Sequence, residues 1–114
     1  MASILLGVSA AVAMDAAARA VADPTRRTIL RLVHDEERTV TEIASHFTVS
    51  RPAISQHLRV LHDAELVSIR QDGTRRYYRS RPEGLAGLHD WLEGFWSERL
   101  DELKRIVEAD HPRR

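Results

Sequence analysis

Apolar positions repeat with a helical period at both ends of the chain and with a strand period in a short stretch between them. Residues 10–22 are rich in alanine, which favours a helix. Residues 82–109 carry apolar side chains at helical spacing and predict one long helix that begins at Pro82. After Leu66 the period changes from about 3.6 to 2, and Asp72-Gly73 is a strong signal for a β-hairpin. The pattern therefore predicts a mainly α-helical chain with one small β-hairpin.

Local capping signals predict two helices after the alanine-rich start. Asp23-Pro24 begins the first of them, because aspartate is a good N-cap and proline suits the first helical position. This helix is expected to run to about residue 34. Thr39 with Glu42 three residues later fits a capping box, which predicts a short helix at about residues 41–47.

Ser50 predicts the start of a further helix at about residues 51–64, in which a proline in the first turn does no harm. Two short helices joined by a turn of about three residues form a helix-turn-helix. The hairpin that follows, with its return strand at about residues 75–79, is a wing. The expected fold is therefore a winged helix-turn-helix in the order α-α-α-α-β-β-α.

The helix at 51–64 has one apolar side and one polar side. Ile54, Leu58 and Leu61 fall within about 60° of each other on a helical wheel and must face a core. The N-terminal end of a recognition helix is the part that reaches base edges. Arginine can bond guanine there, glutamine can bond adenine, and serine accepts either. The candidate base-reading residues are Arg51, Ser55 and Gln56.

Further polar residues of the two helices are expected to contact the DNA backbone or to add contacts from the recognition helix. A solvated polar face is the alternative interpretation, but the preceding helix and the following wing favour DNA reading. The residues assigned to these contacts are Thr41, Ser50, Pro52, His57 and Arg59.

Arginines surround the hairpin turn, where they suit phosphates and a narrow minor groove. In sequence, Asp72 is the one acid that offsets them, so a polyanion partner explains them better than a solvated charged hairpin does. Tyr77 and Tyr78 point to opposite faces of the strand, so one of them belongs to the core, and the pattern leaves open which. The wing residues assigned to DNA are Arg70, Gly73, Thr74, Arg75, Arg76 and Arg79.

Charge is distributed unevenly along a chain whose net charge is zero. Residues 48–81 carry seven arginines against three acids, a net of +4, and residues 82–110 carry eight acids against three bases, a net of −5. The basic middle suits a nucleic acid. The 114 residues suggest one domain, and the absence of cysteine excludes disulfides, thiolate metal sites and a cysteine nucleophile.

The segments "ADPTRRTIL", "TVTEIASHFTVSRPAISQHLRVLHDAELV" and "DGTRRYY", in that order, resemble the ArsR/SmtB family of bacterial winged-helix repressors. The resemblance covers about residues 14–110. It implies a cytoplasmic, homodimeric transcriptional repressor that binds double-stranded DNA at an inverted-repeat operator, with the start of the recognition helix in the major groove.

The resemblance also implies that the first and last helices form the dimer interface. The two tryptophans and the phenylalanine of the last helix then close the dimer core as aromatic anchors, and an aromatic ligand pocket is the alternative. The residues assigned to the interface are Met14, Ala17, Val21, Leu88, Trp91, Leu92, Phe95, Trp96, Leu100 and Leu103.

The chain departs from the metal-sensing pattern of this family. Thr39 and Thr41 stand where one family site has a Cys-x-Cys pair. In the other family site, on the last helix, the matching positions hold Gly87, Leu100 and Leu103. No metal or other cofactor is predicted, and the chain is most similar to the metal-independent branch, with an unknown effector. A weak zinc site at His89, Asp90 and Glu93 is the alternative.

Residues 14–110 form the expected domain, and residues 111–114 a tail. Residues 1–13 are an N-terminal extension of the first helix or the product of a misassigned start, because Met14 reads as a natural beginning. This apolar start ends in an A-x-A pattern, but it lacks a basic n-region and is too short to span a bilayer; a cleaved signal is the alternative. No membrane partner and no enzymatic site are predicted. The rival function is a protein-interaction module that uses the acidic last helix.

Overall fold

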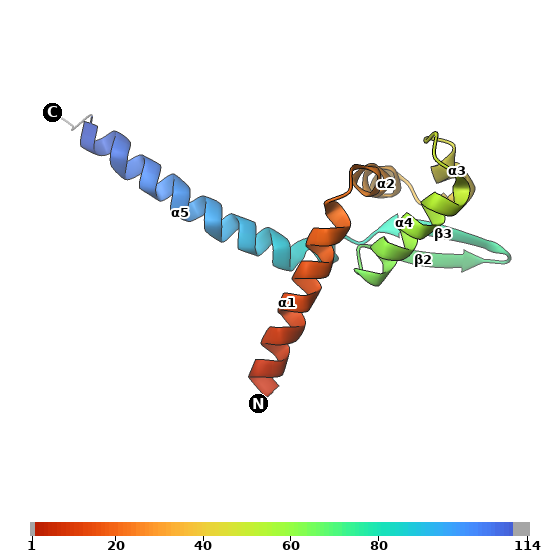
Figure 1. Ribbon diagram of the computed structural model, residues 1–114, viewed down its shortest axis with the longest axis horizontal. Helices are drawn as coiled ribbons and strands as arrows, with labels where there is room; N and C mark the ends of the chain where they lie inside the picture. Colours follow the sequence, from red (N-terminus) through yellow and green to blue (C-terminus); the bar gives the residue numbers. More distant parts are fainter. Residues whose placement is uncertain (1, 111–114) are drawn as a thin grey trace.

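A computed structural model describes residues 2–110, and of residues 2–9 and 110 it describes only the backbone. Two long helices leave a small body in different directions: α1 (Ala2–Val21) and α5 (Ala86–Asp110), as Figure 1 shows. The body holds α2 (Pro24–Asp35), α3 (Val40–Ala44) and α4 (Arg51–Asp63) with the strands β1 (Arg38–Thr39), β2 (Val67–Asp72) and β3 (Arg75–Ser80). The expected tail at residues 111–114 lies outside the described residues.

The three helices of the body begin where their capping residues were predicted. The Asp23 carboxylate accepts from the backbone N–H of Arg26 at 3.0 Å, and the Thr39 hydroxyl accepts from that of Glu42 at 3.2 Å. The Ser50 hydroxyl accepts from the backbone N–H of residue 53 at 3.3 Å. Each bond satisfies a backbone donor that the first turn of a helix leaves free, and is worth about 1 kcal/mol.

One apolar core joins the helices of the body to the base of the wing. Ile54, Leu58 and Leu61 are buried in it, as the helical wheel predicts. Of the two wing tyrosines, Tyr78 is the buried one, and Tyr77 stays half-exposed. Burial of each large side chain contributes roughly 1.5–3 kcal/mol. The remaining core residues are Ala17, Ala20, Ile29, Val33, Ile43, Leu66 and Val67.

The wing is a hairpin with a third, very short strand beside it. The strand order is β1-β3-β2, all antiparallel, and Asp72 pairs with Arg75 across a two-residue loop. Gly73, the first loop residue, has φ +62°, as a type II′ turn requires. The strand β1 was not predicted, because two residues are too short to show a period. It ties the segment before α3 to the wing through the pair of Thr39 and Tyr77.

The third helix is shorter than the expected 41–47. It ends at Ala44, where the Ser45 hydroxyl donates to the Glu42 carbonyl at 2.6 Å. Residues 46 and 47 continue in tight turns with backbone bonds to residues three positions earlier. The connection to α4 is therefore about twice as long as the expected turn.

The last helix also begins later than expected. Pro82–Leu85 is a short 3₁₀ helix, η1, and α5 proper starts at Ala86. Gly84 lies in this 3₁₀ helix and packs so closely against the Glu65 carbonyl that a Cβ there would collide with it. Glu65 itself has φ +61°, and Leu66 N–H donates to Leu61 O at 2.9 Å. These features form a Schellman-type end to α4, with a non-glycine residue in the left-handed position.

Candidate nucleic-acid interface

The start of α4 is an exposed end of the body. Arg51 is the first helical residue, and Ser55 and Gln56 follow about one turn later; all three side chains are exposed. The other predicted contact residues of this region, Thr41, Ser50, Pro52 and Arg59, are exposed too. The buried side of α4 faces the core, so the polar side has only solvent or a partner to meet.

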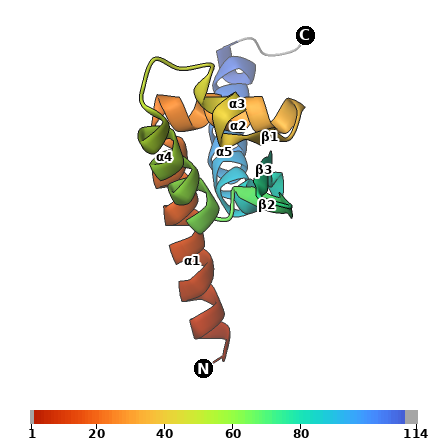
Figure 2. The same cartoon turned by 90° about the vertical axis from the view of Figure 1, so that its right-hand side faces the viewer.

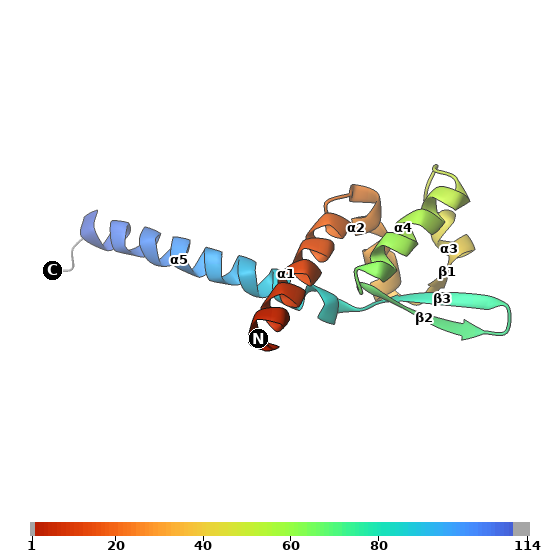
Figure 3. The ribbon, with the colours of Figure 1, turned by 60° about the horizontal axis from the view of Figure 1, so that its bottom comes forward.

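The wing lies beside α4 and extends away from α5. Figure 2 shows α4 on one side and the wing on the other, with α2 and α3 above them. Figure 3 shows α4 lying near the base of the hairpin, whose tip projects beyond the body. The start of the recognition helix and the wing therefore belong to the same end of the molecule.

A cleft of about 480 Å³ separates the start of α4 from the wing tip. It brings together five residues that the sequence assigned to DNA on separate segments. These are Thr41, Arg51, Thr74, Arg75 and Arg76. The sequence interpretation missed three further lining residues, Thr39, Val40 and Glu42, because they were assigned only to the start of a helix. A cleft with three arginines and several hydroxyls suits an extended phosphodiester chain.

The wing arginines do not all share one face. Arg70 lies opposite Tyr77 in the register, so these two side chains are on the same face. Side chains alternate along a strand, so this face also carries Arg75 and Arg79, whereas Arg76 is on the opposite face. At the tip, Arg75 and Arg76 nevertheless line the same cleft.

Arg70 is occupied within the chain. Its Nη2 lies 2.6 Å from Glu37 Oε1, its Nε lies 3.1 Å from the same oxygen, and its guanidinium lies 4.5 Å from the Tyr77 ring centroid. The hydrogen bond from Arg70 lowers the pKa of Glu37, and the same bond raises the pKa of Arg70. The expectation that Asp72 alone offsets the wing arginines is therefore wrong: Glu37 also does so, from the loop after α2.

His57 faces the junction of three helices. Its Nδ1 lies 3.3 Å from Arg26 Nη1, and its side chain is half-buried. Arg26 also reaches back to the last turn of α1, where its Nε donates to the Ala20 carbonyl at 2.7 Å. The sequence could not indicate this contact, since Arg26 and His57 are 31 residues apart.

The two long helices carry the residues assigned to the dimer interface, and α5 presents an uncovered apolar stripe. Trp96 is 63% exposed and Leu100 is 59% exposed, and the other large apolar residues from Trp91 onward are exposed as well. Leu88, Met14 and Val21 are half-buried. Ala17 is fully buried within its own chain, so its assignment to the interface is wrong. Its small side chain packs in the core where α1 meets the body.

The aromatic residues of α5 stack along the helix. The Trp91 and Phe95 rings are nearly parallel, with centroids 6.1 Å apart, and the Arg99 guanidinium lies 5.4 Å from the Phe95 centroid. These contacts join residues about one turn apart. They order the aromatic side chains on a surface that remains exposed.

One group of side chains in the described part of the chain has the composition of a metal site. His89 Nδ1 lies 3.4 Å from Asp90 Oδ1 and 3.6 Å from Glu93 Oε2. All three residues are exposed, and their candidate ligand atoms lie within 4.8 Å of one another. Exposed ligands of this kind hold a metal weakly, because water competes for every position.

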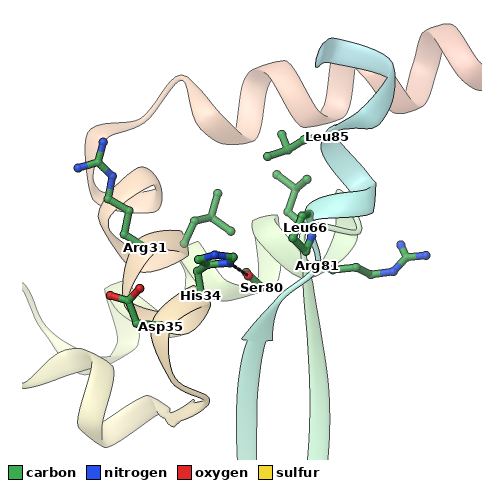
Figure 4. Close-up of a pocket in the computed structure, with 9 residues that line it drawn as sticks. Arg31, His34, Asp35, Leu66, Ser80, Arg81 and Leu85 are labelled. Atoms are coloured by element: carbon green, nitrogen blue, oxygen red, sulfur yellow. Dashed lines mark hydrogen bonds between the residues drawn. The ribbon is translucent and has the colours of Figure 1, made fainter. Parts of the chain in front are cut away.

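A separate cavity of about 370 Å³ lies where the wing passes into the linker to α5. In Figure 4, His34 and Ser80 approach each other in its centre, with a hydrogen bond of 3.0 Å between His34 Nδ1 and Ser80 Oγ. Apolar side chains including Leu66 and Leu85 surround the pair. The bond fastens α2 to the end of β3, so this cavity is also the point where the wing strand is anchored to the body.

Across the residues that the structure describes, every helix is too short or too polar to cross a membrane.

The family model described as "Bacterial regulatory protein, arsR family" matches residues 23–68, from the cap of α2 to the start of β2. The chain is 43% identical over 96 residues to the HTH-type transcriptional regulator Rv2034 of Mycobacterium tuberculosis, covering 84% of this chain and 90% of that protein. It is 38% identical to the transcriptional repressor SdpR of Bacillus subtilis, covering 75% and 94% of the two chains.

A solved structure shares the fold. The solution NMR structure of the homodimeric winged helix-turn-helix DNA-binding domain of Mb0332 from Mycobacterium bovis superposes with a TM-score of 0.63 at 28% identity. The match covers 93% of this chain and 87% of that one. Fold and relatives confirm the resemblance that the sequence motifs indicated, and the matched relatives are regulators. The chain therefore belongs to the arsR family of bacterial regulatory proteins and is a winged helix-turn-helix transcriptional regulator rather than an enzyme.

Proposed function

We propose that this chain is a sequence-specific DNA-binding repressor that acts as a homodimer on an inverted-repeat operator. The observation that carries the proposal is the cleft between the start of α4 and the wing tip, where Arg51 lies across from Arg75 and Arg76. Guanidinium groups that converge on one exposed cleft suit the charge and geometry of a phosphodiester backbone. Membership of a family of transcriptional regulators supports the same conclusion.

Base reading is assigned to the exposed start of α4. In this proposal Arg51, Ser55 and Gln56 enter the major groove, supported by their exposure and by the ability of their side chains to bond base edges. Arg75, Arg76 and the other exposed polar residues around the cleft hold the backbone. This division assigns sequence preference to the helix and most of the salt-dependent affinity to the wing.

The homodimer is proposed from the apolar stripe of α5. Its large side chains are about half-exposed or more, which is unfavourable unless a second surface covers them. The similar domain of Mb0332 is homodimeric, and in a twofold dimer the two recognition helices meet successive major grooves roughly 34 Å apart. A twofold protein reads an inverted repeat, which gives the operator its symmetry.

The proposed repressor does not sense its signal through a metal thiolate or a cysteine thiol. The chain has no cysteine, and Thr39 and Thr41 line the DNA cleft instead. Cadmium or zinc ions at micromolar concentration should leave operator binding unchanged. Release of DNA by either ion, lost in His89→Ala, would instead assign a sensing role to the exposed group on α5.

Selection of bound fragments from the source genome tests the proposal directly. The purified protein should enrich fragments that share an inverted repeat with half-sites about one helical turn apart. Gel shifts on the enriched fragment and on a scrambled version then measure specificity. Failure to enrich any DNA would favour the rival function, a protein-interaction module built on α5.

A further inference from the structure

Arg26 distributes its hydrogen-bond donors over two helices other than its own. Its Nε donates to the Ala20 carbonyl at 2.7 Å and its Nη2 to the Arg19 carbonyl at 3.0 Å, both in the last turn of α1. Its Nη1 lies 3.3 Å from His57 Nδ1 on α4. One planar guanidinium therefore connects the end of α1 to the helix that carries the candidate base-reading residues.

The chemistry of this contact fixes the state of the histidine. A guanidinium has five N–H donors and no acceptor, and it stays protonated in proteins. In a hydrogen bond with Arg26, His57 Nδ1 can only accept, and the tautomer with its proton on Nε2 provides that acceptor. His57 follows the exposed Gln56 directly in the recognition helix and is itself half-exposed. The group that it can offer to a partner is then a single N–H donor, held in one orientation.

Arg27, the neighbour of Arg26, caps the end of α1 but forms no side-chain hydrogen bond with α4 in the described part of the chain. Arg27 Nη1 donates to the Val21 carbonyl at 2.8 Å, also at the end of α1. Among the hydrogen bonds of the described residues, the side chain of Arg27 makes none to α4, whereas that of Arg26 reaches it. Capping of α1 does not require a contact with α4. The contact between Arg26 and His57 therefore indicates a second role for Arg26.

We infer that Arg26 is a positioning residue for DNA binding: it holds His57 as the Nε2–H tautomer, and His57 donates a hydrogen bond from Nε2–H to a DNA phosphate. The inference rests on the proposed function. It adds a residue of α2, which does not line the DNA cleft, to the set that determines affinity. Because the same guanidinium bonds the last turn of α1, it also sets the position of the recognition helix relative to a proposed dimerisation helix.

The test compares Arg26→Lys with Arg27→Lys as its matched control. Lysine keeps the positive charge but cannot reach α1 and His57 together. Arg26→Lys should weaken binding to operator and scrambled DNA alike by about tenfold, because a phosphate contact carries little sequence information. Arg27→Lys should change neither by more than about twofold. Thermal unfolding and sedimentation establish that each variant is folded and equally dimeric.

Substitution of His57 separates positioning from simple capping. His57→Ala should lose affinity to the same extent as Arg26→Lys, and the double variant should lose no more than either, since the two residues act as one unit. His57→Gln keeps an N–H donor near the position of Nε2 and should retain most of the affinity in both backgrounds. Independent, additive losses from Arg26→Lys and His57→Ala would overturn the inference.

The tautomer can be measured without DNA. Nitrogen-15 shifts of the His57 ring at about pH 8, above the ordinary histidine pKa of about 6.5, should show an unprotonated Nδ1 in the wild type and a mixture of tautomers in Arg26→Lys. A mixture in the wild type would overturn the role of Arg26. If the wild type binds no DNA, the proposed function fails and the phosphate contact fails with it, while the ring shifts still decide whether Arg26 fixes the tautomer.

Discussion

Glu37 and Arg70 form a two-pronged ion pair that joins segments 33 residues apart, with Glu37 Oε1 only 2.6 Å from Arg70 Nη2. A second contact of 3.1 Å runs from Arg70 Nε to the same oxygen, and Tyr77 packs under the guanidinium. The pair joins the middle of β2 to the loop after α2. A carboxylate outside the wing therefore contributes to holding the wing against the body.

Replacement of Glu37 by glutamine should reduce the loss of folding stability that the protein shows as the pH is lowered. The bond from Arg70 lowers the pKa of Glu37 below its ordinary 4.5, so the carboxylate stabilises the fold fully above that value. This contribution is lost as the pH falls through the lowered pKa. The difference in unfolding temperature between wild type and Glu37→Gln should be largest near neutral pH and should shrink as acid is added. Glu36→Gln, which removes the neighbouring carboxylate 3.8 Å from Arg38, is the matched control.

Replacement of Arg51 by alanine should loosen sequence preference. We expect it to cost about 1–3 kcal/mol of operator binding and to reduce the ratio of operator to scrambled affinity. The measurement is a pair of titrations at one salt concentration. Unchanged discrimination would contradict a base-reading role for the first residue of α4.

The salt dependence of binding should distinguish two wing arginines. With about five phosphates neutralised per dimer, the log–log slope should be about −4 to −5 in the wild type. Arg75→Ala should weaken all sequences alike and reduce that slope by about one unit for each contacting subunit. Arg70→Ala should change the slope much less, because Glu37 already neutralises that side chain. Equal changes in both variants would show that Arg70 leaves its partner to bind DNA.

Glycine at position 65 should stabilise the protein. Glu65 has φ +61°, which costs a non-glycine residue roughly 1–2 kcal/mol. Glycine removes this strain, but the larger conformational entropy of glycine in the unfolded chain offsets part of the gain. We expect a net gain of about 0.5–1 kcal/mol in the free energy of unfolding, measured by urea denaturation. Glu65→Ala removes the same exposed carboxylate and keeps the strain, so it should gain nothing.

A charge in the middle of the apolar stripe should separate the subunits. Leu100→Glu places a carboxylate where Leu100 is 59% exposed in one chain and, in the proposed dimer, faces its copy. Sedimentation should show a monomer, and operator affinity should fall steeply because one recognition helix holds only half of the contacts. Glu98→Gln changes a charge two residues away and should leave the dimer intact. A dimeric Leu100→Glu would place the interface elsewhere.

Local signals predicted the elements of this fold well, because they act over a few residues. The caps at Asp23, Thr39 and Ser50 and the turn at Gly73 all lie where the sequence places them. Alternation along β3 could not say which tyrosine is buried, since the answer depends on which face the helices cover. The strand β1 exists only through its pairing with β3, and so gives no periodic signal of its own.

Contacts between distant residues set the limits of prediction for the site. The bonds from Arg70 to Glu37 and from Arg26 to His57 each join segments more than 30 residues apart, and nothing in their local sequence indicates them. The position of Ala17 on α1 also could not be predicted from local sequence. An apolar position on α1 can face its own core or a partner, and only the packing of α1 on the body decides between them.

The uncovered length of α5 has a consequence for the lifetime of the chain in a cell. From residue 89 to 109 every side chain is exposed, so the rest of the subunit barely supports this helix. Most of the stability of a helix in a protein comes from tertiary packing, which α5 lacks along this stretch within one subunit. In the proposed homodimer the copy would cover this stripe, so a subunit that has not yet paired would expose α5 to proteolysis.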